Sequence, residues 1–351
     1  LRRDRVTLAM ILGIPVMQLV LFGYAINLNL RGLDAGIADQ ANTAASRALV
    51  MDMVATGVID PAMSTTSPRQ LMEALRRGKI SVGVVVPPDF ERRRADGREA
   101  VQVLVDGSDT VVQAAAIQLA QIPLDDRPVA NAKSERTGRG QISVVSFYNP
   151  QRRSAVNIVP GLIGVILTMT MVLFTAVAIV RERERGNMEL LIATPLSRSE
   201  LMVGKVLPYV AIGLLQTTVV LALGMWLFDV PVRGGVLDVY VAAMLLIVAN
   251  LTLGLLISTR AQSQFQAMQM TFFVFLPSIL LSGFMFPFAG MPRVVQWLAE
   301  VLPLTHFMRL IRGIMLRGAN LVDLWPEVLA LLVFTTVMMA AAILRFRKRL
   351  D

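Results

Sequence analysis

Side chains that could carry out catalysis or bind a metal are scarce in this chain. Its 351 residues include no cysteine and a single histidine, His306, which excludes thiolate zinc sites, cysteine nucleophiles and multi-histidine metal sites. The phosphate-binding pattern G-x-x-x-x-G-K-[ST] is absent, so no such loop is present to hold a nucleotide. The stretch Asp106–Asp109, "DGSD", predicts a strand-ending turn rather than a cation site. We therefore expect no catalysis by this chain, and no metal or cofactor bound to it.

The densest run of charge lies between two long apolar stretches, at residues 181–200, "RERERGNMELLIATPLSRSE". Gly186 permits a sharp bend, and the residues after it predict a short amphipathic helix that ends at Pro195. A capping box at 197–200 then starts the next helix. The two charge signs are interleaved, which favours docking to a protein over lying on lipid headgroups.

Polar residues also occur inside the apolar stretches. Most are expected to form hydrogen bonds between helices, worth on the order of 1 kcal/mol each. The other interpretation is a partly polar path for a solute, for which the candidate lining residues are Gln216, Asn250 and Gln269. No carboxylate lies deep within an apolar stretch, which argues against a proton-coupled antiporter.

The composition indicates that a membrane positions these residues. The chain is 55% hydrophobic with a mean hydropathy of +0.61, well above that of a soluble domain. A helix needs roughly 20 apolar residues to cross a bilayer. The sequence predicts six such helices, the first of which is too long for a cleaved signal peptide. They cover residues 6–28, 156–180, 206–228, 237–257, 267–288 and 326–344.

Lysine and arginine in the short loops predict the orientation. They are denser on the side that holds both chain ends and residues 181–205 than on the opposite side. Both termini are therefore expected in the cytoplasm, and the polar stretch 30–155 outside it. The formal net charge of +9 is explained by basic cytoplasmic loops, so nucleic acid is not an expected partner.

The polar stretch predicts a folded α+β domain inserted between the first and second spans. Strands are expected over 32–40, 79–86, 100–109 and 140–150, the second of them stopped by two prolines. Helices are expected over 43–55, 68–77 and 110–121, with a further short helix between the second and third strands. An arginine-rich part of it is expected to be a solvated face rather than a polyanion site. The predicted organisation is thus a first span within 1–29, an extracytoplasmic domain over 30–155 and a five-helix membrane domain over 156–351.

Two blocks of sequence, with this layout, resemble the type-2 ABC exporter permeases of the drug-efflux branch. The first block fits the pattern R-E-R-E-x-G-x-x-E-x-L-x-x-[TS]-P, and the second, "PLTHFMRLIRG", fits P-L-x-H-x5-R. The matching residues are Arg181, Glu182, Arg183, Glu184, Gly186, Glu189, Leu191, Thr194 and Pro195 in the first block, and Pro303, Leu304, His306 and Arg312 in the second.

The resemblance implies a half-transporter in a bacterial inner membrane. Its partners would be an ABC ATPase subunit that holds ATP and Mg²⁺, a second permease subunit, identical or a sister chain, and an optional periplasmic adaptor. The segment at about 184–195 would be the coupling helix, and 287–320 would form re-entrant helices whose arginines stay in water. The implied coupling residues are Arg181, Glu182, Glu184, Gly186, Glu189, Leu191 and Pro195. Within the re-entrant segment we expect an external gate formed by Pro303, His306 and Arg312. The alternative is that Arg312 only anchors its helix at the lipid headgroups.

Two other functions stay open. A sensor or receptor could use the external domain to bind ligand, but it would not need a docking helix between spans. A membrane-embedded enzyme would need a nucleophile, an acid–base pair or a metal cluster, and none is visible. For an exporter, apolar walls with few fixed charges favour a drug-like or lipid-like amphiphile as cargo.

Overall fold

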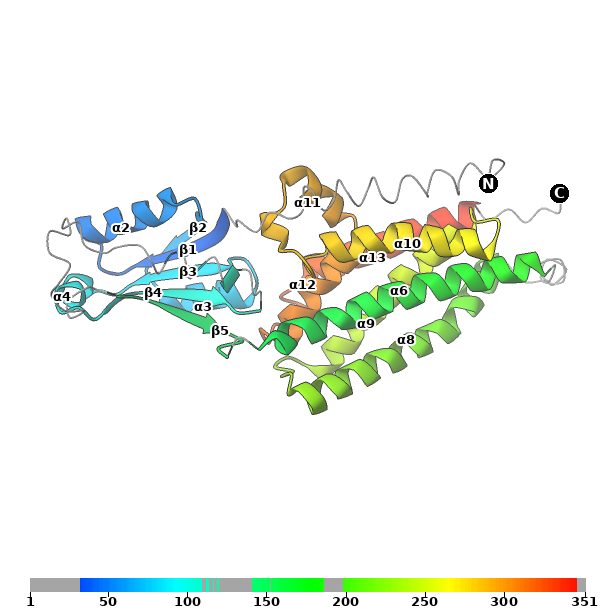
Figure 1. Cartoon of the computed structure of the whole chain (residues 1–351), viewed down its shortest axis with the longest axis horizontal. Helices are drawn as coiled ribbons and strands as arrows, with labels where there is room; N and C mark the ends of the chain where they lie inside the picture. The colour runs from blue at the N-terminus through cyan, green and yellow to red at the C-terminus, as the bar shows by residue number, and fades with distance from the viewer. Residues whose placement is uncertain are drawn as a thin grey trace. The chain divides into compact units, whose positions relative to one another are not determined.

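The computed structural model describes residues 32–108, 112, 113, 116, 119, 141–151, 153–185 and 198–345 (Figure 1). They fall into two compact units, one within Asn27–Asn157 and one from Ile158 onward. The predicted first span at 6–28 and the segment 186–197 lie outside the described residues, as does most of the predicted helix 110–121.

The smaller unit contains a mixed five-stranded sheet in the order β2-β1-β3-β4-β5. β1 pairs in parallel with β2 and β3, β3 is antiparallel to β4, and β4 is parallel to β5. The strands are β1 (Leu33–Asp39), β2 (Ile59–Thr65), β3 (Val82–Val86), β4 (Glu99–Asp106) and β5 (Gln141–Phe147). Four of them match predicted strands. β2 was not predicted, because Pro61 breaks the usual strand pattern and is tolerated only at a sheet edge.

Three described helices accompany the sheet: α2 (Ala44–Ala55), α3 (Pro68–Arg76) and α4 (Phe90–Ala95). α3 starts with proline at its first position, as the sequence predicts. Its buried residues Leu71 and Leu75 pack on the sheet. Gly36 of β1 makes this possible, since a β-carbon there would lie 2.5 Å from the side chain of Leu71.

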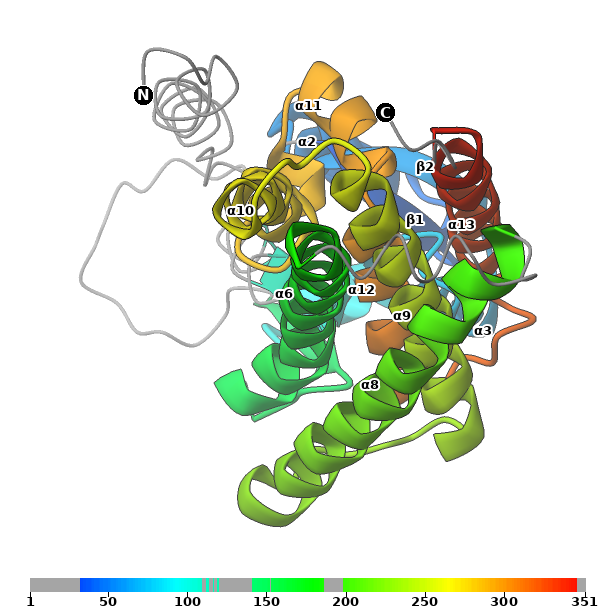
Figure 2. The ribbon, with the colours of Figure 1, turned by 90° about the vertical axis from the view of Figure 1, so that its right-hand side faces the viewer.

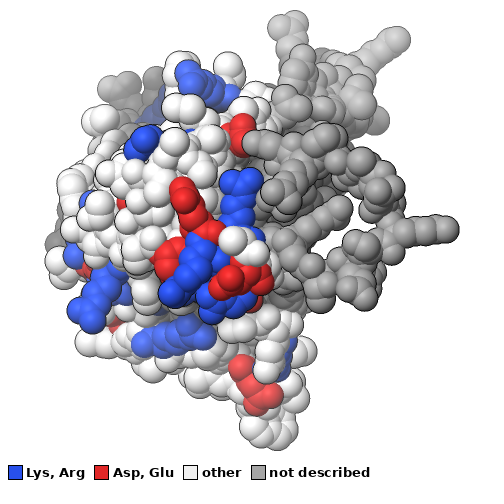
Figure 3. All heavy atoms as spheres, turned by 90° about the vertical axis from the view of Figure 1, so that its left-hand side faces the viewer, with Lys and Arg blue, Asp and Glu red and all other residues white. Residues whose placement is uncertain are grey.

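Several arginines of this unit are paired with acids on its surface. Glu73 bonds to Arg76 and Arg77 of α3, and Asp89 bonds to Arg93 at the start of α4. The arginine partners lower the pKa of Glu73 to about 2. Figure 3 shows basic and acidic side chains next to one another on one face of the molecule. The mixed charge fits the expected solvated face.

The larger unit is a bundle of long apolar helices. Five described helices have the length and composition to cross a membrane: α6 (Ser154–Glu184), α8 (Arg198–Phe228, apolar from Leu207), α9 (Val236–Ser258), α10 (Gln264–Leu281) and α13 (Trp325–Arg345). Each overlaps a predicted span. α10 ends seven residues before the predicted 288, because Gly283 has a φ of +81° and turns the chain away from the helix.

α9 is the centre of this bundle. It packs against α8, α10, α13 and the short helix α12 (Pro303–Met315), and its side chains Leu246 and Ile247 are fully buried (Figure 2). The outer helices α8 and α13 leave most of their apolar surface exposed. This distribution fits a membrane domain in which lipid or another subunit covers the outer helices.

The chain between α10 and α13 forms a 3₁₀ turn (Phe288–Gly290), α11 (Arg293–Glu300) and α12. α12 is buried on nearly every side, with Phe307, Leu310 and Ile311 fully covered. Its last turn accepts hydrogen bonds from the α8–α9 loop, Arg233 N to Met315 O at 2.9 Å and Gly234 N to Ile314 O at 3.0 Å. The end of α8 and the end of α12 therefore lie at the same end of the bundle.

Candidate functional site

The charged end of α6 is attached to the loop that joins α9 and α10. The carboxylate of Glu184 accepts from the backbone N of Gln264 at 3.0 Å and from its side-chain Nε2 at 2.5 Å. The guanidinium of Arg183 donates to the carbonyl oxygen of Ala261. Because Gln264 is the first residue of α10, Glu184 also places a negative charge at a helix N-terminus, which is favourable.

The structure describes only some of the predicted coupling residues. Arg181 and Glu184 are exposed near the end of α6, and Glu182 is half-buried. Gly186, Glu189, Leu191 and Pro195 lie outside the described residues. A displacement of the segment that follows Glu184 would therefore act on α6 directly and on α10 through Gln264.

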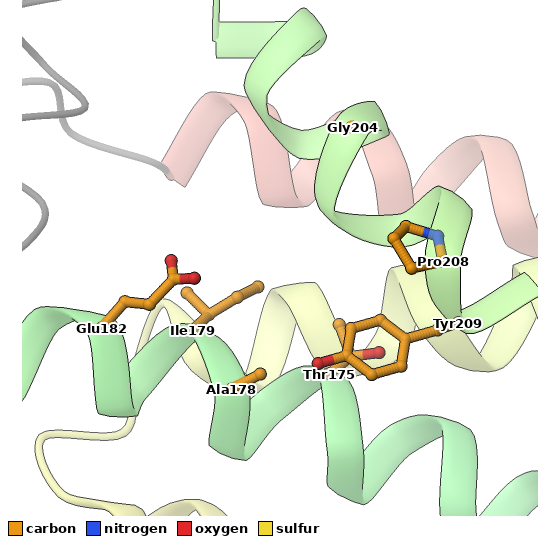
Figure 4. A pocket seen from close by; sticks show the side chains of 7 residues that line it. All are labelled: Thr175, Ala178, Ile179, Glu182, Gly204, Pro208 and Tyr209. Atoms are coloured by element: carbon orange, nitrogen blue, oxygen red, sulfur yellow. The ribbon is translucent and has the colours of Figure 1, made fainter. Parts of the chain in front are cut away.

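Two pockets lie beside this charged end. The first, about 290 Å³, is formed by α6 and α8 and includes Thr175, Glu182 and Tyr209 (Figure 4). The second, about 250 Å³, shares Tyr209 and is lined by more apolar side chains, among them Phe174 and Met268. In Figure 4 the ring of Tyr209 reaches from α8 across to α6. Sequence patterns did not single out Tyr209, since an aromatic residue within an apolar helix is usually a packing residue.

The three predicted path residues make different contacts. Gln216 of α8 accepts from Thr170 of α6 at 2.9 Å, whereas Asn250 of α9 donates to Thr168 of α6 at 3.1 Å. Residues two apart on a helix do not share a face, so the two bonds lie on different sides of α6. Asn250 is fully buried, and Gln269 of α10 keeps a buried oxygen with no hydrogen bond. None of the three lines either of the pockets above.

The predicted gate residues lie on α12. Pro303 is its first residue and is buried, Arg312 is half-buried near its end, and His306 is buried in its first half. The imidazole Nδ1 of His306 lies 2.5 Å from Oε2 of Glu327 on α13, and Nε2 lies 2.8 Å from the carbonyl oxygen of Glu300 on α11. His306 thus links three helices.

Arg309, one turn after His306, links the same helices. Its Nη2 donates to Oε1 of Glu300 at 2.5 Å and its Nη1 to Oε1 of Glu327 at 3.3 Å. The guanidinium also lies over the ring of Phe288, 4.5 Å from its centroid. We call Glu300, His306, Arg309 and Glu327 the four-residue cluster.

Burial and ion pairing act in opposite directions on the cations of the cluster. Burial lowers the pKa of His306, but the hydrogen bonds to Glu327 and to the Glu300 carbonyl outweigh it, so the pKa is raised above its usual value. Burial likewise opposes the charge of Arg309, and the two carboxylates more than compensate, which raises its pKa. The contacts of the cluster therefore favour the charged forms of His306 and Arg309.

Arg309, one of the arginines of 287–320 that were expected in water, has a side chain that is 32% exposed. It is half-buried between two glutamates, because α11 and α13 close over it. Glu300 and Glu327 were not among the predicted site residues. They lie nine and eighteen residues from Arg309, so no local pattern joins them, and only the arrangement of α11, α12 and α13 does.

Comparison with known proteins gives consistent matches along the chain. The model of the ABC-2 family transporter protein matches residues 5–344. The chain is 32% identical to the probable multidrug ABC transporter permease YbhS of Escherichia coli K12, with 96% of this chain and 91% of that protein covered. It is 29% identical to the probable multidrug ABC transporter permease YbhR of the same organism, with 97% and 93% covered.

A third relative, the inner membrane transport permease YhhJ of Escherichia coli K12, is 28% identical over 89% of this chain and 84% of its own length. All three are named as permeases, and each match covers 89% or more of this chain. Together with the family match over residues 5–344, these comparisons establish that the chain belongs to the ABC-2 family of transporter proteins.

Proposed function

We propose that this chain is the membrane-spanning subunit of an ATP-driven exporter whose ATPase is a separate chain. The partner would bind ATP and Mg²⁺, and this chain would carry no catalytic residue. The bundle would lie in the bacterial inner membrane with both termini in the cytoplasm and the sheet-containing unit outside. The single observation that carries this proposal is the family match over nearly the whole chain, to relatives named as permeases.

The attachment of Glu184 to Gln264 supports a route for transmitting force. The segment 184–195 would dock in a cleft of the ATPase, with Glu189 and Leu191 in contact and Pro195 ending the helix. Movement of that segment on ATP binding would shift the end of α6, and the Glu184–Gln264 and Arg183–Ala261 bonds would carry the shift to the start of α10. Helices α6 and α10 would then move together and change the side of the membrane to which the transport path opens.

The four-residue cluster is proposed to hold the opposite end of the bundle closed. It ties α11 and α12 to α13 with two cations between two carboxylates. Opening at this end would require α12 to move relative to α13, which breaks those pairs. Pro303 and Arg312 would act with His306, Pro303 by fixing where α12 starts and Arg312 by its charge near the end of the helix.

The cargo proposed is a drug-like or lipid-like amphiphile. The pockets between α6, α8 and α10 combine apolar walls with the phenol of Tyr209 and a few polar groups, which suits such a molecule. A second permease subunit, identical or related, would complete the path. The exposed apolar surfaces of α8 and α13 leave room for such a subunit as well as for lipid.

Copurification tests the proposal. Co-expression of the chain with a candidate ABC ATPase subunit should yield a complex in mild detergent with vanadate-sensitive ATP hydrolysis. Glu189→Lys or Leu191→Asp should abolish the complex while the variant chain still inserts, whereas Glu91→Gln, an exposed site on α4, should leave the complex intact. A complex that survives both changes would contradict docking through 184–195.

A receptor would give a different result. Its external unit would bind a ligand with no nucleotide-binding subunit attached, and the same two substitutions would have no effect. Transport of a fluorescent amphiphile into inverted vesicles, dependent on ATP, distinguishes an exporter from a receptor directly.

A further inference from the structure

The helix α11 is amphipathic, but its apolar side faces outward. Val294, Trp297, Leu298 and Val301 recur at the spacing of one helical face, and their exposed fractions run from 58% to 72%. The opposite side faces the protein. There Ala299 is fully buried against the end of α10. In a water-facing helix the apolar side would be the one turned inward.

Polar contacts hold α11 in this orientation. The side-chain Nε2 of Gln296 donates to the carbonyl oxygens of Met291 at 2.9 Å and Phe288 at 3.3 Å. Glu300 bonds to Arg309 of α12. The contacts of Gln296 and Glu300 thus hold one side of α11 against the rest of the bundle, and the apolar side chains of the helix face outward.

The positions of the tryptophans indicate what contacts the outward face of α11. The chain has three, and all are strongly exposed: Trp226 at 79%, Trp297 at 72% and Trp325 at 62%. Trp226 is in the last turn of α8, and Trp325 is the first residue of α13. Tryptophan is enriched where a membrane meets water, because its ring is apolar and its N–H needs a polar partner.

All three lie at the same end of the bundle. The α8–α9 loop bonds to the last turn of α12, as described above, and Arg309 joins α11 and α13 through Glu300 and Glu327. In Figure 1 α11 lies at the end of α10 that leads into it. Arg293, exposed at the first position of α11, adds a cation that suits a lipid phosphate.

We propose that α11 is an interfacial helix. Its apolar face lies among the upper acyl chains of one leaflet, at the level that Trp226 and Trp325 also mark, while Arg293 reaches the phosphates. Because Glu300 is on α11, lipid contact then holds the helix that completes the four-residue cluster. This placement concerns the membrane boundary and does not depend on what the protein transports.

The depth of Trp297 in a bilayer tests the proposal. The chain with Trp226→Phe and Trp325→Phe keeps Trp297 alone, and can be placed in nanodiscs of phosphatidylcholine and phosphatidylglycerol that carry brominated acyl chains. Trp297 emission should fall most with bromine near the carbonyl end of the acyl chain. A depth control replaces all three tryptophans with Phe and adds Leu215→Trp, at a 64% exposed site about 16 Å along α8 from Trp226.

The control should lose most emission to bromine near the chain terminus. Three results would overturn the proposal. Quenching of Trp297 by aqueous acrylamide but not by lipid would place the face in water. No quenching by either would mean that protein covers it, whether a second copy or another part of this chain. Greatest quenching by the deep label would place α11 in the acyl core. Monodisperse elution of each variant, compared with the unsubstituted chain, controls for folding.

Discussion

The imidazole of His306 faces an acceptor oxygen at each of its nitrogens, and the nearer is Oε2 of Glu327 at 2.5 Å. A neutral imidazole can donate from one nitrogen only, whereas the imidazolium donates from both. The contact between these two residues therefore favours the protonated ring. It also joins α12 to α13, as does the bond between Arg309 and Glu327.

The first prediction is a pH dependence that comes from this contact. The folded-state pKa of His306 is raised, so its contribution to stability is complete below the ordinary histidine pKa and is lost as pH rises through the folded value. The apparent melting temperature in detergent should fall over that range for the unsubstituted chain and lose this part of its dependence in His306→Gln. Since the chain has one histidine, its ring resonances can be assigned without ambiguity. A ring pKa below that of a free histidine would contradict the prediction.

The second prediction concerns Arg309. Its planar group bonds to carboxylates of two helices at once, which the single ammonium of lysine cannot reproduce. Arg309→Lys should lower apparent stability by about 1–2 kcal/mol and reduce transport, with the ATPase subunit still bound. Arg293→Lys, at an exposed site, serves as the matched control and should behave like the unsubstituted chain. Equal transport by Arg309→Lys would show that charge alone suffices.

The third prediction separates docking from transmission at the end of α6. Because the Glu184 carboxylate is bonded to Gln264, Glu184→Ala should retain the ATPase subunit yet weaken the stimulation of ATP hydrolysis by cargo. Gln264→Ala removes the side-chain bond alone and should show a smaller loss. A double variant no worse than Glu184→Ala would show that the two residues act together. Loss of the ATPase subunit in Glu184→Ala would instead assign the carboxylate to docking.

The fourth prediction is the orientation in the membrane. A labelling site in the smaller unit must be exposed. Ser64 on β2 is exposed, whereas Ser108 after β4 is only 3% exposed and a cysteine there would be shielded from reagents. The chain lacks native cysteine, so Ser64→Cys and Gln262→Cys, in the α9–α10 loop, can be labelled singly. An impermeant thiol reagent applied outside the cell should label position 64 and miss 262. The opposite pattern would reverse the topology inferred from lysine and arginine.

The fifth prediction compares two polar residues in the bundle. Asn250 is fully buried between helices and bonds to Thr168, so Asn250→Leu should lower apparent stability by on the order of 1 kcal/mol and leave the range of transported compounds unchanged. Tyr209 lines both pockets, so Tyr209→Ala should change that range with little effect on stability. Uptake of a panel of fluorescent amphiphiles into inverted vesicles measures the range of transported compounds for both variants, and the apparent melting temperature in detergent measures their stability. An altered range of transported compounds in Asn250→Leu would indicate that Asn250 lines the transport path.

The sequence alone determined the membrane class, the apolar helices and most strands of the sheet, because hydrophobic periodicity is a local property of each segment. It also located the charged run at 181–200 and the block around His306, both of which consist of neighbouring residues. It missed β2, whose edge pairing with β1 compensates for a proline that local propensity counts against.

Only the tertiary structure decided which of these residues meet. Glu300 and Glu327 are unremarkable in sequence, yet packing of α11 and α13 around α12 brings both to Arg309. Gln216 and Asn250 look alike as polar residues in apolar helices, but they bond on different sides of α6. The spacing of the apolar residues in the sequence shows which side of α11 is apolar. It does not show whether that side faces the protein or faces outward. The hydrogen bonds of Gln296 and the pairing of Glu300 with Arg309 set that orientation, because these contacts hold the polar side of α11 toward the protein and leave Trp297 facing outward.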